Sequence, residues 1–174
     1  TTEASIAREA LAFARLTAEL AGRTELLSED VPATAREYVN GPLADSIREV
    51  ELRIARANSE GFEAQQTVLN EQIAEAGKGL DLLEQLLEKV SGNVELGRAD
   101  LERTRELNKR GLNTKSEISD RQRQLADGEA RQLQVLANLS QSRRDIGLLK
   151  SRLVELGQKR KVDALVDLQA HNVS

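Results

Sequence analysis

Apolar residues recur every seven positions through the middle of the chain, and this repeat limits the possible folds more than any other feature. Two positions of each heptad are apolar: one holds Ile73, Leu80, Leu87, Val94 and Leu101, and the other holds Phe62, Leu69, Ala76, Leu83 and Val90. Apolar side chains at both positions over several heptads are typical of a coiled coil, in which each helix packs its stripe against another. We therefore expect a helix over about 42–110. Its pattern weakens at Gly97 and Thr104, where small residues permit close approach of a second helix and lower local helix stability.

A second helix with the same repeat is expected over about 115–168. Its apolar positions hold Ile118, Leu125, Leu139, Ile146 and Leu153, and also Val135, Leu149 and Leu156, with interruptions at Gly128, Gln132 and Ser142. In the connection, Gly111 suits the left-handed residue that ends a helix. Thr114 with Glu117 matches a capping box. Because the connection is short, the two helices must run antiparallel.

A shorter helix is expected near the start of the chain, over about 5–27. Its heptad positions hold Ile6, Phe13, Leu20 and Leu27. Pro32 lies just beyond this helix and disfavours helix in the residue before it. A short helical turn over 32–39 is expected next. Pro42 then suits the first position of the long helix.

The short helix has an apolar stripe that must be covered. By a rise of about 1.5 Å per residue, the 42–110 helix is roughly 100 Å long and the 115–168 helix roughly 80 Å, so the start of the longer one extends beyond its partner. We therefore expect the short helix to fold back antiparallel on that start. Leu16 and Leu20 would then pack within about 43–62.

These patterns together predict an all-α fold. We expect one domain over residues 1–174, a long antiparallel coiled-coil hairpin with an additional short N-terminal helix packed at its base. Only 2% of the residues are aromatic and 31% are charged, which favours a long coiled coil over a compact globule. The chain contains no Met, and we interpret it as a fragment of a larger protein.

The sequence offers little that could carry out chemistry. It has no Cys, and its one histidine, His171, has no other candidate ligands spaced around it. It also lacks a glycine-rich phosphate loop and a nucleophile elbow. We therefore predict no catalytic, cofactor-binding or metal-binding residues and no enzymatic activity.

Charge and hydropathy also bound the possible partners. The net charge of −4 comes from interleaved acidic and basic residues, which gives no reason to expect nucleic-acid binding. No stretch approaches the ~18 apolar residues of a membrane span, so no membrane contact by this fragment is expected. One basic cluster is either a docking face or, as we favour, a solvated helix face: Arg143, Arg144, Lys150, Arg152, Lys159, Arg160 and Lys161.

The connection between the long helices resembles the hairpin tip of periplasmic adaptor proteins, also called membrane fusion proteins. That family carries an Arg, a Leu four positions later and a Ser seven after that. Arg103, Leu107 and Thr114 match this spacing, with Thr in place of Ser. Gly111 and Leu112 also match the usual run through the turn. The resemblance implies that these five residues form a partner-binding tip.

The remainder of the chain resembles the HlyD-like adaptors of type I secretion, whose hairpin has an extra first helix. The similarity includes Ala18–Arg23, Val31–Pro32 and Arg56–Ile73. It implies three kinds of partner: a TolC-like outer-membrane channel, an inner-membrane ABC transporter, and neighbouring copies in a homo-oligomeric ring. It also implies a location in the periplasm of a Gram-negative bacterium, as part of a protein anchored in the inner membrane.

Two other functions remain open from the sequence. A purely structural coiled-coil rod explains the heptads equally well, but not the short first helix or the spacing of the tip residues. The hairpin of a multidrug efflux adaptor is a closer alternative. Such hairpins usually have two helices, so the helix over 5–27 favours the secretion branch.

Overall fold

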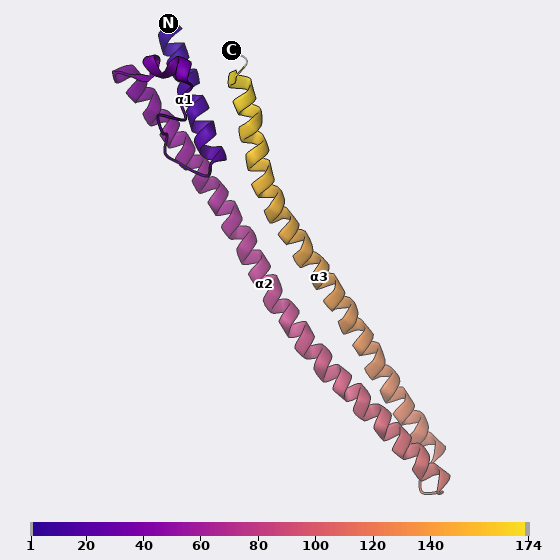
Figure 1. Ribbon diagram of the computed structural model, residues 1–174. Coiled ribbons are helices and arrows are strands. Elements are labelled where there is room, and N and C mark those ends of the chain that lie inside the picture. Colours follow the sequence, from indigo (N-terminus) through magenta and orange to yellow (C-terminus); the bar gives the residue numbers. More distant parts are fainter. Residues whose placement is uncertain (1, 173–174) are drawn as a thin grey trace. The chain divides into compact units, whose positions relative to one another are not determined.

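The computed structural model describes residues 2–172, and every regular element in that range is helical (Figure 1). The elements are α1 (Thr2–Leu20), the 3₁₀-helix η1 (Ala33–Val39), α2 (Pro42–Lys109) and α3 (Lys115–Asn172). The all-α prediction is confirmed. No helix within residues 2–172 offers an apolar stretch long enough to cross a membrane.

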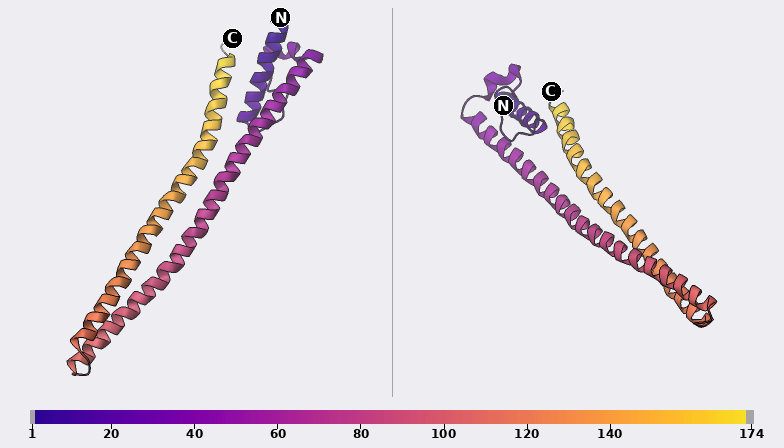
Figure 2. Two further views of the ribbon diagram at one scale, coloured as in Figure 1. Left: turned by 180° about the vertical axis from the view of Figure 1, so that it is seen from behind. Right: turned by 60° about the horizontal axis from the view of Figure 1, so that its bottom comes forward.

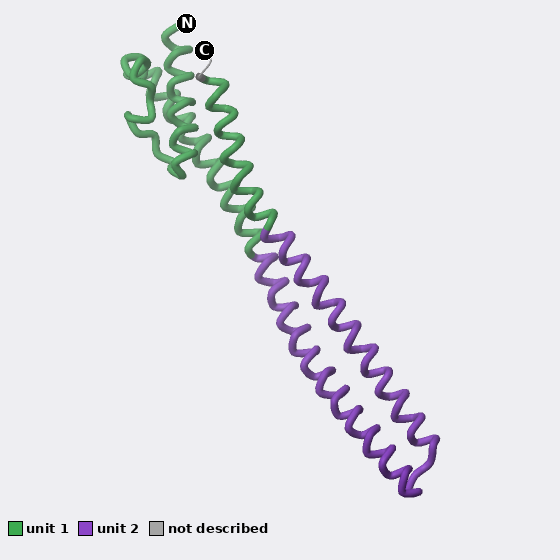
Figure 3. The backbone as a smooth tube through the Cα atoms, turned by 45° about the vertical axis from the view of Figure 1, so that its right-hand side comes forward, with its two compact units in different colours: residues 1–70, 151–174 green, residues 71–150 purple. Residues whose placement is uncertain are grey.

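The described residues form two compact units (Figure 3). Unit 1 is drawn from residues 1–70 and 151–174, and unit 2 comprises residues 71–150. Each unit contains a part of α2 and a part of α3. The prediction of a single domain stays a prediction.

In unit 2, α2 and α3 pack along the heptad stripes that the sequence predicts. Val94 and Leu101 on α2, and Val135 and Leu139 on α3, are buried. Thr104 is also buried, with 8% of its surface exposed. The heptad pattern weakens there, but the packing does not, because a small side chain whose hydroxyl bonds to its own helix fits the seam, as expected of a small residue that permits close approach. Thr104 Oγ1 donates to the carbonyl oxygen of Asp100 at 2.8 Å.

Small and polar residues let the two helices approach closely in this seam. A methyl group placed on Gly97 would lie 3.5 Å from Leu125 Cδ1, and one on Gly128 would lie 3.5 Å from Val94 Cγ2. Next to them, Gln132 of α3 donates a hydrogen bond to Ser91 Oγ of α2 at 3.0 Å. The interruptions at Gly97, Gly128 and Gln132 are therefore places where the two helices meet.

We predict that Gly97→Ala stabilises the chain by about 0.5–1 kcal/mol, because alanine is the better helix former and its methyl group has ordinary contact space. Gly97→Leu should be less stable than Gly97→Ala, since overpacking costs about 1–3 kcal/mol. Chemical denaturation followed by circular dichroism measures both. Gly92→Ala is the matched control: its methyl group meets no atom within 4 Å, so it reports helix propensity alone. A Gly97→Leu variant as stable as Gly97→Ala would contradict the close approach.

In unit 1, α1 is enclosed by its neighbours. One cluster unites buried side chains of α1 with those of the following segment: Ala10, Leu11, Ala14, Val31, Ala35 and Val39. Ile6, Leu26 and Ile47 pack against this cluster. On another side of α1, Arg15 Nε donates to Glu51 Oε2 of α2 at 2.7 Å. The helix therefore contacts both the connecting segment and α2.

The expected direction of α1 was wrong. Arg15 bonds to Glu51, and Glu19, one turn later on α1, accepts from Asn58, which comes later on α2. Both helices advance in the same direction, so α1 runs parallel to α2 (Figure 2). The reason is the segment 21–41, which returns along α1 and passes through η1 before α2 begins. The expected position on the first third of α2 is correct, and Leu16 is buried.

The expected end of α1 at about Leu27 was also wrong, since the helix ends at Leu20. Gly22 adopts a left-handed φ of 72°. Its N–H donates to the Glu19 carbonyl at 3.0 Å, and the Arg23 N–H donates to the Ala18 carbonyl at 2.8 Å. This is the Schellman pattern that ends helices at glycine.

Beyond α1, an ion pair fixes the returning segment. The Arg23 guanidinium donates to both oxygens of Asp30, at 2.8 and 3.0 Å, and the Leu27 N–H donates to Oδ2 at 2.8 Å. The Asp30 side chain is 4% exposed. Its hydrogen bonds with Arg23, supported by the Leu27 N–H, hold the pKa of Asp30 below its ordinary value against the opposing effect of burial.

We predict that Asp30→Asn removes a pH-dependent part of the stability. Because the folded-state pKa of Asp30 is lowered, its contribution is complete above the ordinary carboxyl pKa of about 3.9 and is lost as the pH falls through the lowered value. The difference in Tm between wild type and Asp30→Asn should therefore be largest at neutral pH and shrink below pH ~4. Glu29→Gln, an exposed neighbour with the same loss of charge, is the control. An equal Tm difference at every pH would contradict the role of the ion pair.

Candidate functional site at the hairpin tip

The turn that joins α2 to α3 is closed by its own backbone. Gly111 has a left-handed φ of 73°. Its N–H donates to the Asn108 carbonyl at 2.8 Å, and the Leu112 N–H donates to the Leu107 carbonyl at 3.0 Å. These two bonds form the Schellman pattern. Gly111 therefore ends α2, as its sequence position predicts.

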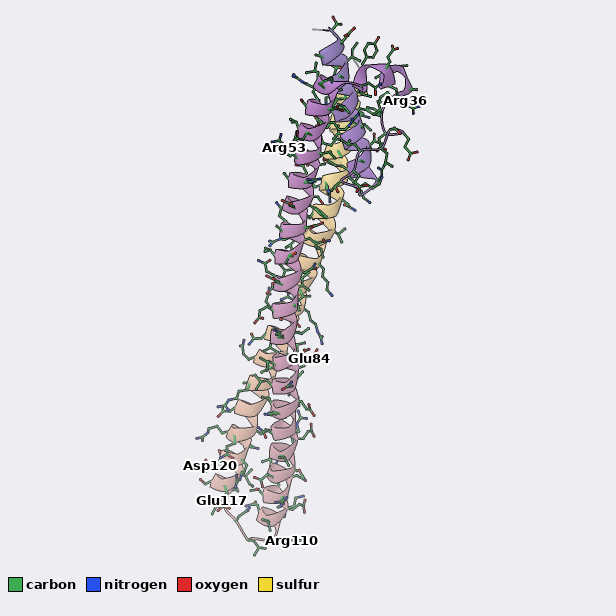
Figure 4. All side chains as sticks on the ribbon, turned by 90° about the vertical axis from the view of Figure 1, so that its left-hand side faces the viewer. Arg36, Arg53, Glu84, Arg110, Glu117 and Asp120 are labelled. Carbon is green, nitrogen blue, oxygen red and sulfur yellow. The ribbon has the colours of Figure 1, made fainter. Side chains whose placement is uncertain are left out.

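Thr114 caps the start of α3. Its Oγ1 accepts a hydrogen bond from the Glu117 N–H at 3.3 Å, which satisfies one of the free N–H groups at the helix start. Figure 4 shows Arg110 and Glu117 on either side of the turn. The side chain of Thr114 is exposed, so the capping group can also reach a partner.

Two asparagines that the sequence analysis did not single out also hold the turn. Asn108 Nδ2 donates to the Asn113 carbonyl at 3.0 Å, and Asn113 Nδ2 donates to the Thr104 carbonyl at 2.9 Å. The latter bond ties the loop to α2 at Thr104, five residues before the end of that helix. Asn113 Oδ1 is buried and finds no hydrogen-bond partner among residues 2–172. The signal in the sequence was asparagine beside a glycine turn, where short amide side chains bond to nearby backbone.

Two of the predicted tip residues with long side chains, Arg103 and Leu112, lie mostly in solvent, and Leu107 is partly exposed. Leu112 is 70% exposed and Leu107 is 36% exposed. The Arg103 side chain is 73% exposed, and its nearest ion-pair contact is Asp100 at 4.0 Å. The turn therefore combines a fixed backbone with exposed apolar and cationic side chains, an arrangement suited to protein contact.

Ion pairs lie close to the tip. Arg121 of α3 meets Asp100 of α2 at 3.1 Å. Lys109 Nζ lies 2.9 Å from Glu106 Oε1, and this hydrogen bond raises the pKa of Lys109, so the lysine stays charged. No group of His, Asp and Glu side chains suited to a metal ion occurs in the described part of the chain.

We predict that Asn113→Ala lowers stability by about 1 kcal/mol, because one hydrogen bond to the Thr104 carbonyl is lost. Asn113→Asp should cost more, since a partly buried carboxylate would replace the amide that donates to that carbonyl. Asn138→Asp is the matched control: its Oδ1 already accepts from Gln134, so a carboxylate keeps the bond. Denaturant melts at pH 7 compare the three variants. Equal stability of Asn113→Asp and Asn138→Asp would show that Asn113 does not hold the turn.

Comparison with known proteins adds to this geometry. The family model described as AprE, long alpha-helical hairpin, matches residues 2–173. Among solved structures, the chain is similar to the soluble domain of LipC, a membrane fusion protein of a type I secretion system. The TM-score is 0.88 at 11% sequence identity, and the match covers 98% of this chain and 78% of the LipC chain. No match is found among curated proteins.

Proposed function

The chain belongs to the family of the long α-helical hairpin of AprE, and from this premise we propose that it is the hairpin of a periplasmic adaptor in a type I secretion system. Its role is to bridge an inner-membrane ABC transporter to a TolC-like outer-membrane channel. The tip residues Arg103, Leu107, Gly111, Leu112 and Thr114 make the contact with the channel. The function is one of binding and assembly.

The tip geometry carries this proposal. Backbone groups at the turn are bonded within the chain, so the turn presents side chains to a partner. Leu112 and Leu107 present apolar surface at the end of unit 2, and burial of such a side chain contributes about 1.5–3 kcal/mol. Arg103 can donate several hydrogen bonds to a carboxylate or backbone carbonyl of the channel.

The similarity to LipC supports the wider assignment. LipC is a membrane fusion protein of a type I secretion system, and this chain shares its fold. By analogy, the proposed adaptor lies in the periplasm of a Gram-negative bacterium, is anchored in the inner membrane, and assembles as a ring of identical copies. The ABC transporter is its proposed partner at the inner membrane.

The secretion branch is favoured over a multidrug efflux adaptor by α1. The family match includes this helix as well as α2 and α3, whereas an efflux hairpin needs two helices. A purely structural rod is disfavoured by the tip. A rod requires no exposed leucines at a turn that is already closed by its backbone.

We expect Leu107→Asp and Arg103→Glu, each in the full-length protein, to abolish export while the hairpin stays folded. A carboxylate at Leu107 would be buried without a partner at the channel, which costs several kcal/mol, and a ring repeats that loss at every copy. Thr114→Ala should be milder, since it removes a cap worth ~1 kcal/mol. Export, pull-down of the channel and circular dichroism melts are measured for each variant.

Leu43→Asp is the matched control for these variants. Leu43 is a leucine with 58% exposure at the start of α2, in unit 1, so the same charge is added outside the tip. Its channel binding should equal that of the wild type. Wild-type channel binding by Leu107→Asp, or unfolding of that variant, would refute the tip contact.

A further inference from the structure

Unit 2 carries an exposed stripe on α2 that the tip does not use. The α2 stripe follows the three- and four-residue spacing of one helix face: Gly79, Leu82, Leu86, Lys89, Asn93 and Leu96. Leu82, Leu86 and Leu96 are 65%, 45% and 70% exposed. Lys89 is the one charged residue of the stripe, in a chain of which 31% is charged. Exposed apolar surface with so little charge marks an interaction site.

A second stripe lies on α3 of the same unit. The α3 stripe consists of Ala126, Ala130, Leu133, Leu136, Ala137 and Ser140, all exposed. Leu133 and Leu136 are 68% and 40% exposed. The segment from Gln132 to Ser142 contains no charged residue. A solvated helix face would not need to exclude charge over three turns.

The two stripes lie on opposite sides of the hairpin in unit 2. Ion pairs mark one side, where Arg98 meets Glu129 at 3.4 Å and Arg143 meets Glu84 at 3.2 Å. Leu136 lies midway between Glu129 and Arg143, one heptad from each, and so shares their side. The ion pair between Asp100 and Arg121 marks the other side.

The α2 stripe belongs to this second side. Leu86 lies two heptads before Asp100 on α2, and residues at multiples of seven share a side in a coiled coil. Leu82 and Leu96 lie next to the same line of positions at helical spacing. One side of the hairpin therefore presents the α2 stripe, and the other presents the α3 stripe.

The two stripes also lie at the same height along the hairpin. Val94 of α2 packs opposite Gly128 of α3. Because the helices are antiparallel, a residue that precedes Val94 on α2 is level with the residue that follows Gly128 on α3 by the same number of positions. Leu86 is therefore level with Leu136, and Leu82 is level with Ser140.

We infer that the α2 stripe of one copy packs on the α3 stripe of the next copy, side by side and without an axial shift. This inference rests on the proposed function and identifies the surfaces through which neighbouring copies meet. Two different patches on opposite sides make a heterologous contact, the type that generates rings when it closes. With zero shift, Leu86 meets Leu136 of the neighbouring copy.

Charges at the edges of the stripes complement one another in this arrangement. Lys89 lies about one helical turn from the level of Glu129 on the neighbouring copy. Glu75 lies about one turn from the level of Arg144 at the other end. Both pairs join opposite signs, which supports a second copy of this chain as the occupant.

Cysteine cross-linking in the full-length protein tests this inference. Residues 1–174 contain no Cys, and any cysteine elsewhere in the full-length protein is first changed to Ser, so that Leu86→Cys and Leu136→Cys introduce the only thiols. A mixture of the two single variants should form a disulfide-linked dimer on oxidation, and the double variant should form a ladder of higher multiples. Each single variant alone should stay monomeric on a denaturing gel. Leu82→Cys with Ser140→Cys repeats the test one turn along.

Leu86→Cys mixed with Ala126→Cys is the control for register. Ala126 lies ten residues from Leu136 on α3, about 15 Å along the helix, which is beyond disulfide reach. Dimers from this mixture at the same yield would overturn the zero shift. Dimers of Leu86→Cys alone would show a two-fold contact and overturn the heterologous arrangement. Cross-linked products whose mass is not a multiple of this chain would show that a different partner covers the stripes. The absence of a product from both the Leu86–Leu136 and the Leu82–Ser140 pairs would also refute a second copy as the partner.

The outcome is separable from that of the proposed function. If no cross-link forms but Leu107→Asp still loses the channel, the stripe contact fails and the adaptor function stands. If the cross-links form but the tip variants bind the channel normally, the contact between copies stands and the tip function fails.

Discussion

The packing of α2 against α3 in unit 2 is the constraint on which the tip depends. A turn this short holds its exposed side chains in place only if the two helices stay together up to its edge. The buried Thr104 extends the seam toward the end of α2, and Asn113 bonds back to the same residue. Because a buried residue of the seam also bonds to the turn, the packing of the seam helps to hold the tip residues in place.

Close approach of the helices comes from the residues that a heptad count treats as defects. Gly97 admits Leu125, and Gly128 admits Val94, so each glycine receives a large side chain of the other helix. A seam filled with leucine throughout would be more apolar but would separate the helix axes. The alternation of large and small side chains also fixes which residues face each other, and hence the heights compared across the hairpin.

The parts predictable from the sequence were those governed by local rules. The heptads gave the buried faces of α2 and α3, and Gly111 and Thr114 marked the turn, since helix ends follow short-range hydrogen bonding. The direction of α1 was not predictable in this way, because a connection as long as 21–41 permits either direction and the choice depends on contacts with Glu51 and Asn58. The hydrogen bond from Asn113 to the Thr104 carbonyl was not predictable either, since it depends on how the turn folds back on α2.

The ion pair inside unit 1 has a consequence for α1. Five of the seven buried residues of this helix are alanines, and alanines one turn apart present almost the same shape to a neighbouring helix. The alanines by themselves would allow α1 to slide along α2 by a turn at little cost. Arg15 and Glu51, whose side chains are 13% and 9% exposed, oppose that movement. In a slipped helix the buried Glu51 carboxylate would lose its cation, while Arg15 would keep Glu19 of its own helix. Together with the buried Leu11 and Leu16, the salt bridge to Glu51 therefore selects one position of α1 along α2.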